Sequence, residues 1–321
     1  MEAVLRLLRR AADDGHTAVA VVTVVASVGQ AAVEAAVRSG AAVTEGPWLA
    51  LEELATAEDA VADEVLGLAA EERLAIVLGP VPEGAEVVVV TDVHRRPLED
   101  VAAQLQAVPD QVRVVVSGDP DALPGAAPGA VLADLLAWGA LPVRDLRDTA
   151  GDGPGAGSTA LAGLPAALRR GELPEPSDQS VVVVPCGSDE EVVRRAVQLV
   201  TDSVPRVFGV AASDVLVVAP LNRGGAGVRA LLDALPAGTR VLTIHQAAAT
   251  GERADAVVAC LSGQAAGVLS RALLYSTAQL ARRHLSVVTA VGAALPRAVA
   301  GPEPHPRQTR LLGLLRAAGP D

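Results

Sequence analysis

The stretch VVVSGDPDALPGAAPGAVLADLLAWGALPVRDL, residues 114–146, begins with a run of valines and then places two aspartates and two prolines directly behind it. The valines predict a strand buried on both faces, because a half-buried strand would alternate apolar with polar residues. Asp119 and Asp121 then follow the carboxyl end of that strand, the end at which open parallel sheets bind their ligands. Taken alone, the same spacing also fits a rigid turn in which one aspartate caps the next helix.

Seven further runs of the same kind are spread along the chain. Near-continuous Val, Ile and Leu runs separated by helical patterns predict an α/β protein with mostly parallel sheets. The runs are LAIVL, EVVVV, SVVVVP, DVLVVAP, TRVLTI, ADAVVAC and HLSVVTA. The Gly-rich stretch DTAGDGPGAGSTA interrupts them, and we expect residues 148–158 of it to link two α/β lobes.

The first part of the chain has a different pattern. Residues 1–13 repeat apolar positions at helical spacing, a second helix is predicted near residues 31–39, and AAVTEGPWLAL is typical of a small hairpin. These elements predict a small helical or winged-helix-like domain over residues 1–57.

Composition limits the chemistry. All 26 basic residues are arginine and the sequence contains no lysine, so chemistry that needs a lysine ammonium is excluded. The formal net charge is -12 and aromatic residues make up 1% of the chain, which disfavours strong DNA binding. The two cysteines predict neither a disulfide framework nor a metal site. The amphipathic start of the chain and the lack of an 18-residue apolar run lead us to expect a cytoplasmic protein without a membrane span.

Several segments, taken in chain order, are similar to one protein family. The 114–146 stretch resembles the GDPDQLP…GPGxVLxDL segment of RecD-like superfamily-one DNA helicases, the family of the exodeoxyribonuclease V alpha subunit. EVVVVTDVHRRPLEDVAAQL resembles its Walker B strand and following helix, and LPAALRRGELPEP resembles its helix ending in RxGELPE. Three later segments match in the same way: VLVVAPLNRGGAGVRALLDAL, TIHQAAATGERADAVVA and VLSRALLYSTAQLARRHLSVV.

The resemblance implies two RecA-like lobes of the P-loop NTPase type, with ATP and magnesium between them and single-stranded DNA across the top. Residues 58–147 would form a truncated first lobe and residues 159–321 the second. The chain passes from one matched segment to the next through LDALPAG, where the family carries an inserted β-barrel that helps to grip DNA. We therefore expect the second lobe to lack that barrel.

The departures from the family fall on the residues that carry its chemistry. GPVPEGA stands where a Gly-rich loop ending in Gly-Lys-Thr would cradle phosphate and magnesium, so we expect the P-loop and its helix to be deleted. The Walker B pair of Asp and Glu aligns with Thr91 and Asp92. The glutamine that would sense the terminal phosphate aligns with Ala122, and the arginine that would stabilise transition-state charge aligns with Leu280. A shifted alignment would let Arg282 take that last role.

The resemblance leaves a set of vestigial nucleotide-binding positions and four degenerate ones, and it implies no metal ligands. The vestiges are Gly79, Gly118, Asp119, Asp121, Arg223, His245 and Arg282. We expect no catalytic residue, no cofactor in place of the family's ATP and magnesium, and therefore a pseudoenzyme that acts as a binding or scaffold protein in DNA metabolism. An unknown protein partner is expected, with weak DNA binding at most. Two alternatives stay open: a residual ATP-binding helicase, and an unrelated Rossmann-like enzyme.

Overall fold

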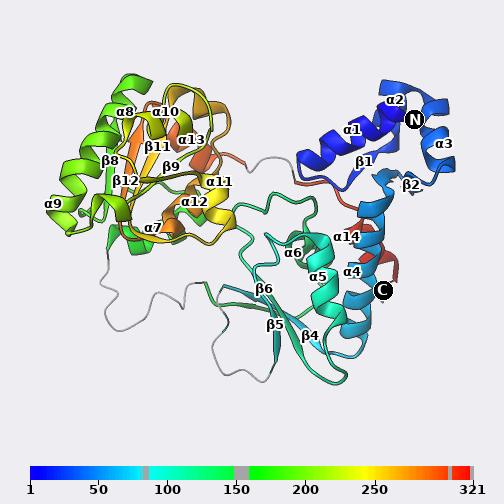
Figure 1. Ribbon diagram of the computed structural model, residues 1–321. Coiled ribbons are helices and arrows are strands. Elements are labelled where there is room, and N and C mark those ends of the chain that lie inside the picture. Colours follow the sequence, from blue (N-terminus) through cyan, green and yellow to red (C-terminus); the bar gives the residue numbers. More distant parts are fainter. Residues whose placement is uncertain (80, 82–86, 148–158, 303–305, 319–321) are drawn as a thin grey trace. The chain divides into compact units, whose positions relative to one another are not determined.

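The computed structural model describes residues 1–79, 81, 87–147, 159–302 and 306–318. The chain forms two compact units, which are described separately (Figure 1). Unit 1 contains Met1–Pro120, Pro124–Ala150 and His305–Asp321, and unit 2 contains Asp121–Leu123 and Gly151–Pro304. Among the described residues no single helix is long and apolar enough to cross a membrane, although the bent pair Val21–Val28 and Gln30–Arg38 passes on length and composition together.

Unit 1 begins with three helices and a small antiparallel sheet. Its strands lie in the order β1-β3-β2, and α2 meets α3 at Gly29 with a bend of 115°. Gly29 has φ +84°, a left-handed conformation that glycine adopts at little cost. The elements are α1 (Glu2–Asp13), β1 (Ala18–Ala20), α2 (Val21–Val28), α3 (Gln30–Arg38), β2 (Ala42–Glu45) and β3 (Trp48–Leu51). The helices predicted near residues 1–13 and 31–39 and the predicted hairpin therefore form.

Helix α4 (Glu52–Ala70) leads into a four-stranded parallel sheet, called sheet B here. Its strands are β4 (Leu74–Leu78), β5 (Val88–Val90), β6 (Val114–Gly118) and β7 (Val143–Asp145), in the order β5-β6-β4-β7. Alternate residues such as Leu74, Ile76 and Val116 point into one core together with side chains of the covering helices. These helices are α4, α5 (Leu98–Gln106), α6 (Val131–Trp138) and α14 (Leu311–Ala318).

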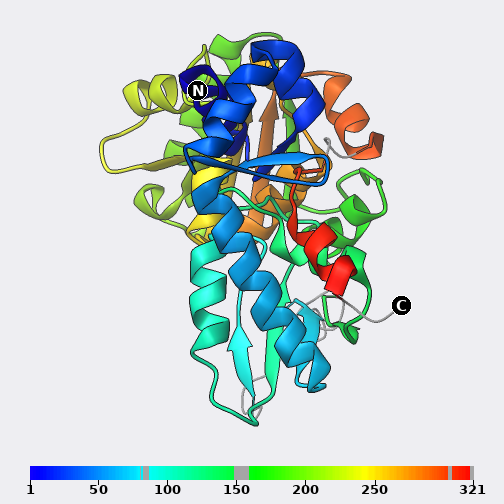
Figure 2. The same ribbon diagram turned by 90° about the vertical axis from the view of Figure 1, so that its right-hand side faces the viewer.

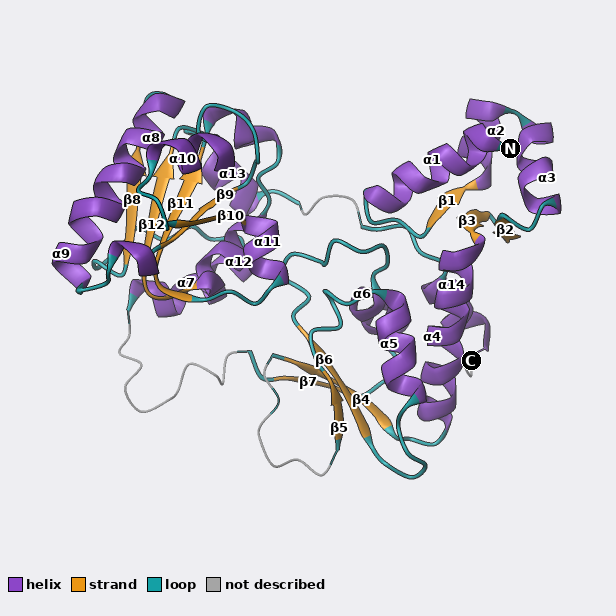
Figure 3. Ribbon diagram, viewed as in Figure 1, coloured by secondary structure: helices purple, strands orange, loops and turns teal. Residues whose placement is uncertain are grey.

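Unit 2 is built on a five-stranded parallel sheet, called sheet C here, with helices on both faces (Figure 3). Its order is β10-β9-β11-β12-β8, with β8 (Val181–Pro185), β9 (Leu216–Ala219), β10 (Arg240–Thr243), β11 (Ala254–Leu261) and β12 (Ala281–Thr289). One face packs on α7 (Ala160–Arg169), α11 (Ile244–Ala249), α12 (Arg271–Leu280) and α13 (Ala294–Ala300). The other packs on α8 (Asp189–Gln198), α9 (Val204–Phe208) and α10 (Val228–Ala234).

The α/β class predicted from the valine-rich runs is confirmed, with both large sheets parallel. Two details differ from the predicted segmentation. Residue 57 falls inside the continuous helix α4, so the small N-terminal sheet and sheet B share one compact unit. The tail, predicted to end the second lobe, instead forms α14, which lies along α4 of unit 1 (Figure 2) and also contacts α6. Leu311 and Leu315 of α14 are fully buried. The predicted linker, residues 148–158, lies outside the described residues.

Candidate functional site

The strand order of sheet B defines one preferred position for a ligand. From β4 the chain runs to β5, which lies beyond β6 at one edge of the sheet. From β6 it crosses back over β4 to β7, at the opposite edge. In open parallel sheets a ligand binds in the crevice outside the carboxyl ends of two neighbouring strands whose connections run toward opposite edges of the sheet. Here these strands are β4 and β6, which end at Leu78 and Gly118 in direct register. Gly79, Asp119 and, after β5, Asp92 follow the carboxyl ends of adjacent strands.

Arg147 covers Gly79 at this edge. Gly79 has φ +96° and donates its N–H to Gly118 O at 3.1 Å. A Cβ at Gly79 would lie 3.2 Å from both Cγ and the backbone nitrogen of Arg147, so the arginine stem lies directly against the glycine backbone. Of the segment predicted to replace the P-loop, only Gly79 and Val81 belong to the described residues.

The Arg147 guanidinium is engaged by carboxylates of the same edge. Its Nε and NH2 donate to the two oxygens of Asp145, at 2.9 and 2.6 Å, in a bidentate pair. Its NH1 lies 3.5 Å from Asp119 Oδ1, and the side chains of Arg147 and Asp119 are only 15% and 13% exposed. A phosphate at this edge would have to compete with these two aspartates for the arginine.

His94 closes the other side of Gly118. A Cβ at Gly118 would lie 3.0 Å from His94 Nδ1, and the same nitrogen accepts the Asp119 N–H at 3.3 Å. Burial, reinforced by the Arg95 charge, lowers the pKa of His94 to about 4. The imidazole is therefore neutral near pH 7 and adds no positive charge for an anion.

The degenerate Walker B positions lie at the end of β5. Thr91 Oγ1 accepts a hydrogen bond from Arg96 NH2 at 3.2 Å, and Thr91 O accepts one from Arg96 Nε at 2.5 Å. Asp92 is exposed and has φ +55°, a left-handed conformation that aspartate adopts more readily than most residues. Within the described part of the chain, no group of three or more His, Cys, Asp or Glu side chains is arranged to hold a metal ion.

The GDPDALP segment is divided between the two units. Gly118 is the last residue of β6 and Asp119 follows it in unit 1, whereas Asp121–Leu123 belong to unit 2. Ala122 and Leu123 are buried in the core on the α12 face of sheet C, and the Leu123 N–H donates to Ser276 Oγ at 2.8 Å. The position aligned with a phosphate-sensing glutamine is thus a buried methyl group.

The remaining predicted residues lie at opposite ends of sheet C. Arg223 follows the carboxyl end of β9, and His245 lies in the first turn of α11, just after β10. Arg282 lies instead at the amino end of β12, next to Ala281, which pairs with Ala254 of β11. Its NH1 is 3.9 Å from Asp255 Oδ1. Leu280 is 3% exposed and belongs to the core. At about 3.3 Å per residue, the eight steps of β12 separate its two ends by roughly 26 Å, so Arg282 is not near Arg223.

Asp189 was not among the predicted site residues, yet it lies at the carboxyl edge of sheet C. Its Oδ1 accepts the Gly263 N–H at 2.7 Å, and a Cβ at Gly225 would lie 2.8 Å from its Oδ2. The sequence marks Ser188 as a helix N-cap, and its hydroxyl does accept the Glu191 N–H. Nothing in the local sequence indicates that Asp189 reaches the loops after β9 and β11, because that contact depends on the sheet order.

No family model matches the chain. Among solved structures, the fold is weakly similar to arterivirus nonstructural protein 10, described as a helicase, with a TM-score of 0.36 and 13% identity over 80% of this chain and 69% of that one. The complex of that protein with DNA gives a TM-score of 0.37 and 13% identity over 81% of this chain and 71% of that one. A likeness this weak carries no argument about the site.

Proposed function

We propose that the chain is a RecD-like helicase homologue that does not turn over ATP and acts by binding other macromolecules. The observation that carries the proposal is the Arg147 cluster: at the β4–β6 edge, where a nucleotide phosphate would bind, the chain's own guanidinium is paired with Asp145 and Asp119. The two parallel sheets are consistent with RecA-like lobes, and the ordered sequence resemblance supports the family.

The degenerate positions support the loss of catalysis independently. Phosphoryl transfer in P-loop motors depends on a loop lysine, a carboxylate that holds magnesium, a water-orienting residue and an arginine on the transferred group. This chain has no lysine, has Thr91 and Asp92 at the Walker B pair, and has the buried Leu280 at the arginine position. At the aligned positions this chain lacks the groups that stabilise transition-state charge. We therefore infer that it acts by binding.

We expect no ATP hydrolysis above background. An arginine finger alone contributes about 10³–10⁵ in rate, and its loss together with the P-loop lysine leaves no source of comparable acceleration. Phosphate release should be measured with magnesium and ATP, with and without single-stranded DNA. Thermal unfolding of the same protein at millimolar ATP should show no shift, because a ligand that does not bind the folded state does not stabilise it.

The Asp92→Ala variant is the control for the ATP experiment. Asp92 is exposed, and alanine at its φ of +55° should cost only about 1–2 kcal/mol, so the variant should still fold. A trace activity that is equal in both proteins would come from a contaminant. A turnover near one per second that disappears in Asp92→Ala would contradict the proposal and support the alternative of a residual helicase.

A nucleic-acid role is the second candidate, and the α2–α3 pair is the observation that favours it. The two helices meet at 115°, an angle typical of a helix-turn-helix, although the single residue Gly29 joins them; they belong to the winged-helix-like arrangement that we propose for residues 1–57. The exposed face of α3 opposes tight binding, because Glu34 lies between Gln30 and Arg38 and contacts both.

We expect DNA binding to be weak. Unit 1 carries 13 arginines and 24 carboxylates, and unit 2 carries 13 arginines and 14 carboxylates, so neither has the positive charge that phosphate binding requires. Fluorescence anisotropy with a labelled oligo-dT and a labelled duplex should give dissociation constants above about 10 μM at physiological salt. Submicromolar binding of either probe would show that a local arginine surface outweighs the net charge.

A further inference from the structure

Sheet C ends at β8, and the backbone of this strand is paired on one side among the described residues. Leu285 N–H donates to Ser180 O and Cys186 N–H donates to Thr289 O, both at 2.8 Å. In a parallel ladder, alternate residues direct their N–H and C=O to opposite sides. The even-numbered residues of β8 therefore bond β12, and Val181 and Val183 direct their backbone groups away from the sheet.

This edge lacks the usual protection against strand pairing. Natural edge strands carry charges, bulges or internal prolines that prevent the addition of another strand. Val181–Val184 are four consecutive valines with no charge, and the outward-facing Pro185 limits the open edge to this stretch. Main-chain groups spaced by two residues on a β-branched strand are the template used when a protein adds an extended peptide to its sheet.

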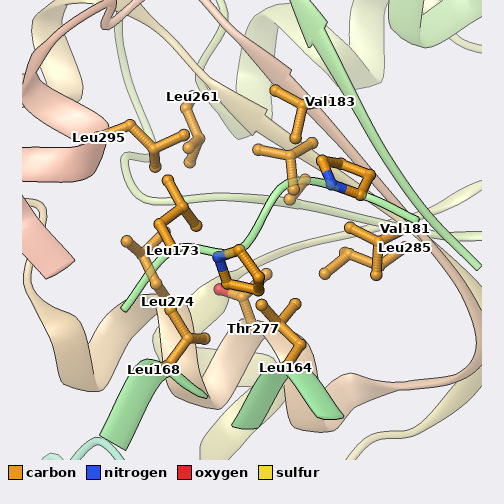
Figure 4. Close-up of a pocket in the computed structure, with 14 residues that line it drawn as sticks. Leu164, Leu168, Leu173, Val181, Val183, Leu261, Leu274, Thr277, Leu285 and Leu295 are labelled. Atoms are coloured by element: carbon orange, nitrogen blue, oxygen red, sulfur yellow. The ribbon is translucent and has the colours of Figure 1, made fainter. Parts of the chain in front are cut away.

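A pocket lies beside the same strand (Figure 4). The pocket together with the open solvent at its mouth has a volume of about 530 Å³. Its walls come from α7, β8, β11, β12, α12, α13 and the segment Leu173–Pro176. Thr277 is the one polar side chain among the 14 that line it, and its hydroxyl already donates to Leu273 O at 2.7 Å. Val183 and Leu173 are 37% and 39% exposed, so apolar surface continues from the pocket to the strand edge.

The charges around the pocket decide between two occupants. Glu172, Glu175 and Asp178 are exposed on the segment that forms one wall, and Glu172 pairs with Arg170 at 2.8 Å. A second copy of this chain, paired edge to edge about a two-fold axis, would bring identical acidic segments close together, which is unfavourable. A basic peptide would be attracted.

We propose that β8 and this pocket bind an extended peptide of a partner protein. The peptide adds a strand to sheet C through the outward backbone groups of Val181 and Val183, places one aliphatic or aromatic side chain in the pocket, and has basic residues on either side of it. Since every residue in the proposal belongs to unit 2, it stands independently of the ATP and DNA predictions.

The test uses the full chain and peptides of the form Arg-Thr-Val-X-Val-Thr-Arg, where X is Leu, Ile, Met, Phe or Asp. We expect fluorescein-labelled peptides with an apolar X to bind with dissociation constants below about 100 μM. Peptides with Asp at X, or with Glu replacing both arginines, should bind at least about tenfold more weakly. Lack of binding by every apolar peptide at millimolar concentration would overturn the proposal.

Two variants probe the strand and the pocket. Val183→Pro removes an outward N–H that the sheet does not use, and Leu173→Asp places a charge at the pocket mouth. Each should weaken peptide binding about tenfold, with unchanged thermal unfolding. The matched control is Leu232→Asp on α10, which is 52% exposed and does not line the pocket, and it should bind as the wild type does.

Two results would count against the proposal. Equal peptide affinity in Val183→Pro and wild type would show that the strand edge is not used. A wild-type dimer in solution that Val183→Pro converts to a monomer would assign the edge to a second copy of the chain.

Discussion

Replacing Arg310 with leucine is expected to destabilise unit 1 by about 3–5 kcal/mol, the cost of removing one partner of a buried ion pair. Arg310 is 4% exposed, and its guanidinium contacts Glu45, Asp59 and the fully buried Glu58. Without Arg310, the Glu58 carboxylate would have no cation within reach in the described structure. Burial already raises the pKa of Glu58, so the variant would have to protonate it or carry an unpaired charge.

The measurement is urea unfolding followed by tryptophan fluorescence. Both tryptophans, Trp48 and Trp138, lie in unit 1, so the signal reports that unit without a contribution from unit 2. The matched control is Arg316→Leu in the same C-terminal segment, where an exposed guanidinium donates to Ala137 O at 3.1 Å. We expect the control to lose less than about 1 kcal/mol.

A second substitution separates charge from packing. Glu58 Oε1 accepts hydrogen bonds from Thr17 Oγ1 at 2.6 Å, Arg310 N at 3.0 Å and Leu311 N at 3.3 Å. Glu58→Gln keeps an acceptor for these donors and removes the charge, so it should recover part of the stability lost in Arg310→Leu. A loss below 1 kcal/mol in Arg310→Leu, or no recovery with Glu58→Gln, would contradict the account of an uncompensated buried charge.

The sequence was sufficient to predict most of the strands. The eight valine-rich runs all become strands of sheets B and C, because a strand buried on both faces has a continuous apolar signal. The strand β7 was missed. Its three residues, Val143–Asp145, are all exposed at the edge of sheet B, so they show neither a continuous apolar run nor an alternation.

The packing of the C-terminal segment could not be predicted from local patterns. Leu311–Ala318 was expected as a short helix, and it forms, but its place in unit 1 depends on partners some 180 to 290 residues away. Arg307 donates to the carbonyls of Gly125, Ala127 and Gly129, and Thr17 N donates to Gln308 O. One feature of the sequence indicates that α4 contacts a polar partner. Glu58 lies on the buried face of α4, and a buried carboxylate requires a hydrogen-bonding or charged partner.

The sequence predicts a candidate site at the end of a strand, but it does not predict which side chains meet there. The carboxyl end of β6 was identified from GDPD, and the strand order places Gly79 and Asp92 at the same edge. Arg147 was not identified, because its contact with Gly79 requires β7 to lie next to β4. The vestigial position Asp121 and the degenerate position Ala122 were expected in the same lobe as Asp119, whereas both belong to unit 2.

Replacing Asp134 with asparagine is expected to stabilise unit 1 at neutral and alkaline pH. Burial, with a smaller contribution from Glu58, raises the pKa of Asp134 to about 7, while Thr309 Oγ1 donates to its Oδ1 at 3.0 Å. The unfolded chain loses this proton near pH 4, and the folded chain keeps it to about pH 7. The free energy of unfolding therefore falls as pH rises from 4 to 7, and it stays low above that range.

The size of the Asp134 effect follows from the shift. Three pKa units at about 1.4 kcal/mol each set an upper bound of roughly 4 kcal/mol, and relaxation of the site reduces it to on the order of 2 kcal/mol. Asp134→Asn mimics the protonated acid, so urea unfolding of unit 1 should show a gain at pH 8 that vanishes near pH 4. The slope that remains belongs to Glu58, whose pKa burial also raises.

Asp110→Asn is the control for this pH dependence, since it makes the same chemical change at an exposed loop position of the same unit. Its stability should follow the wild type at every pH. If Asp134→Asn were instead less stable than the wild type at pH 8, the carboxylate would be favourable in the folded state. That result would mean that Asp134 is ionised where it lies and that the Thr309 hydrogen bond helps to stabilise its charge.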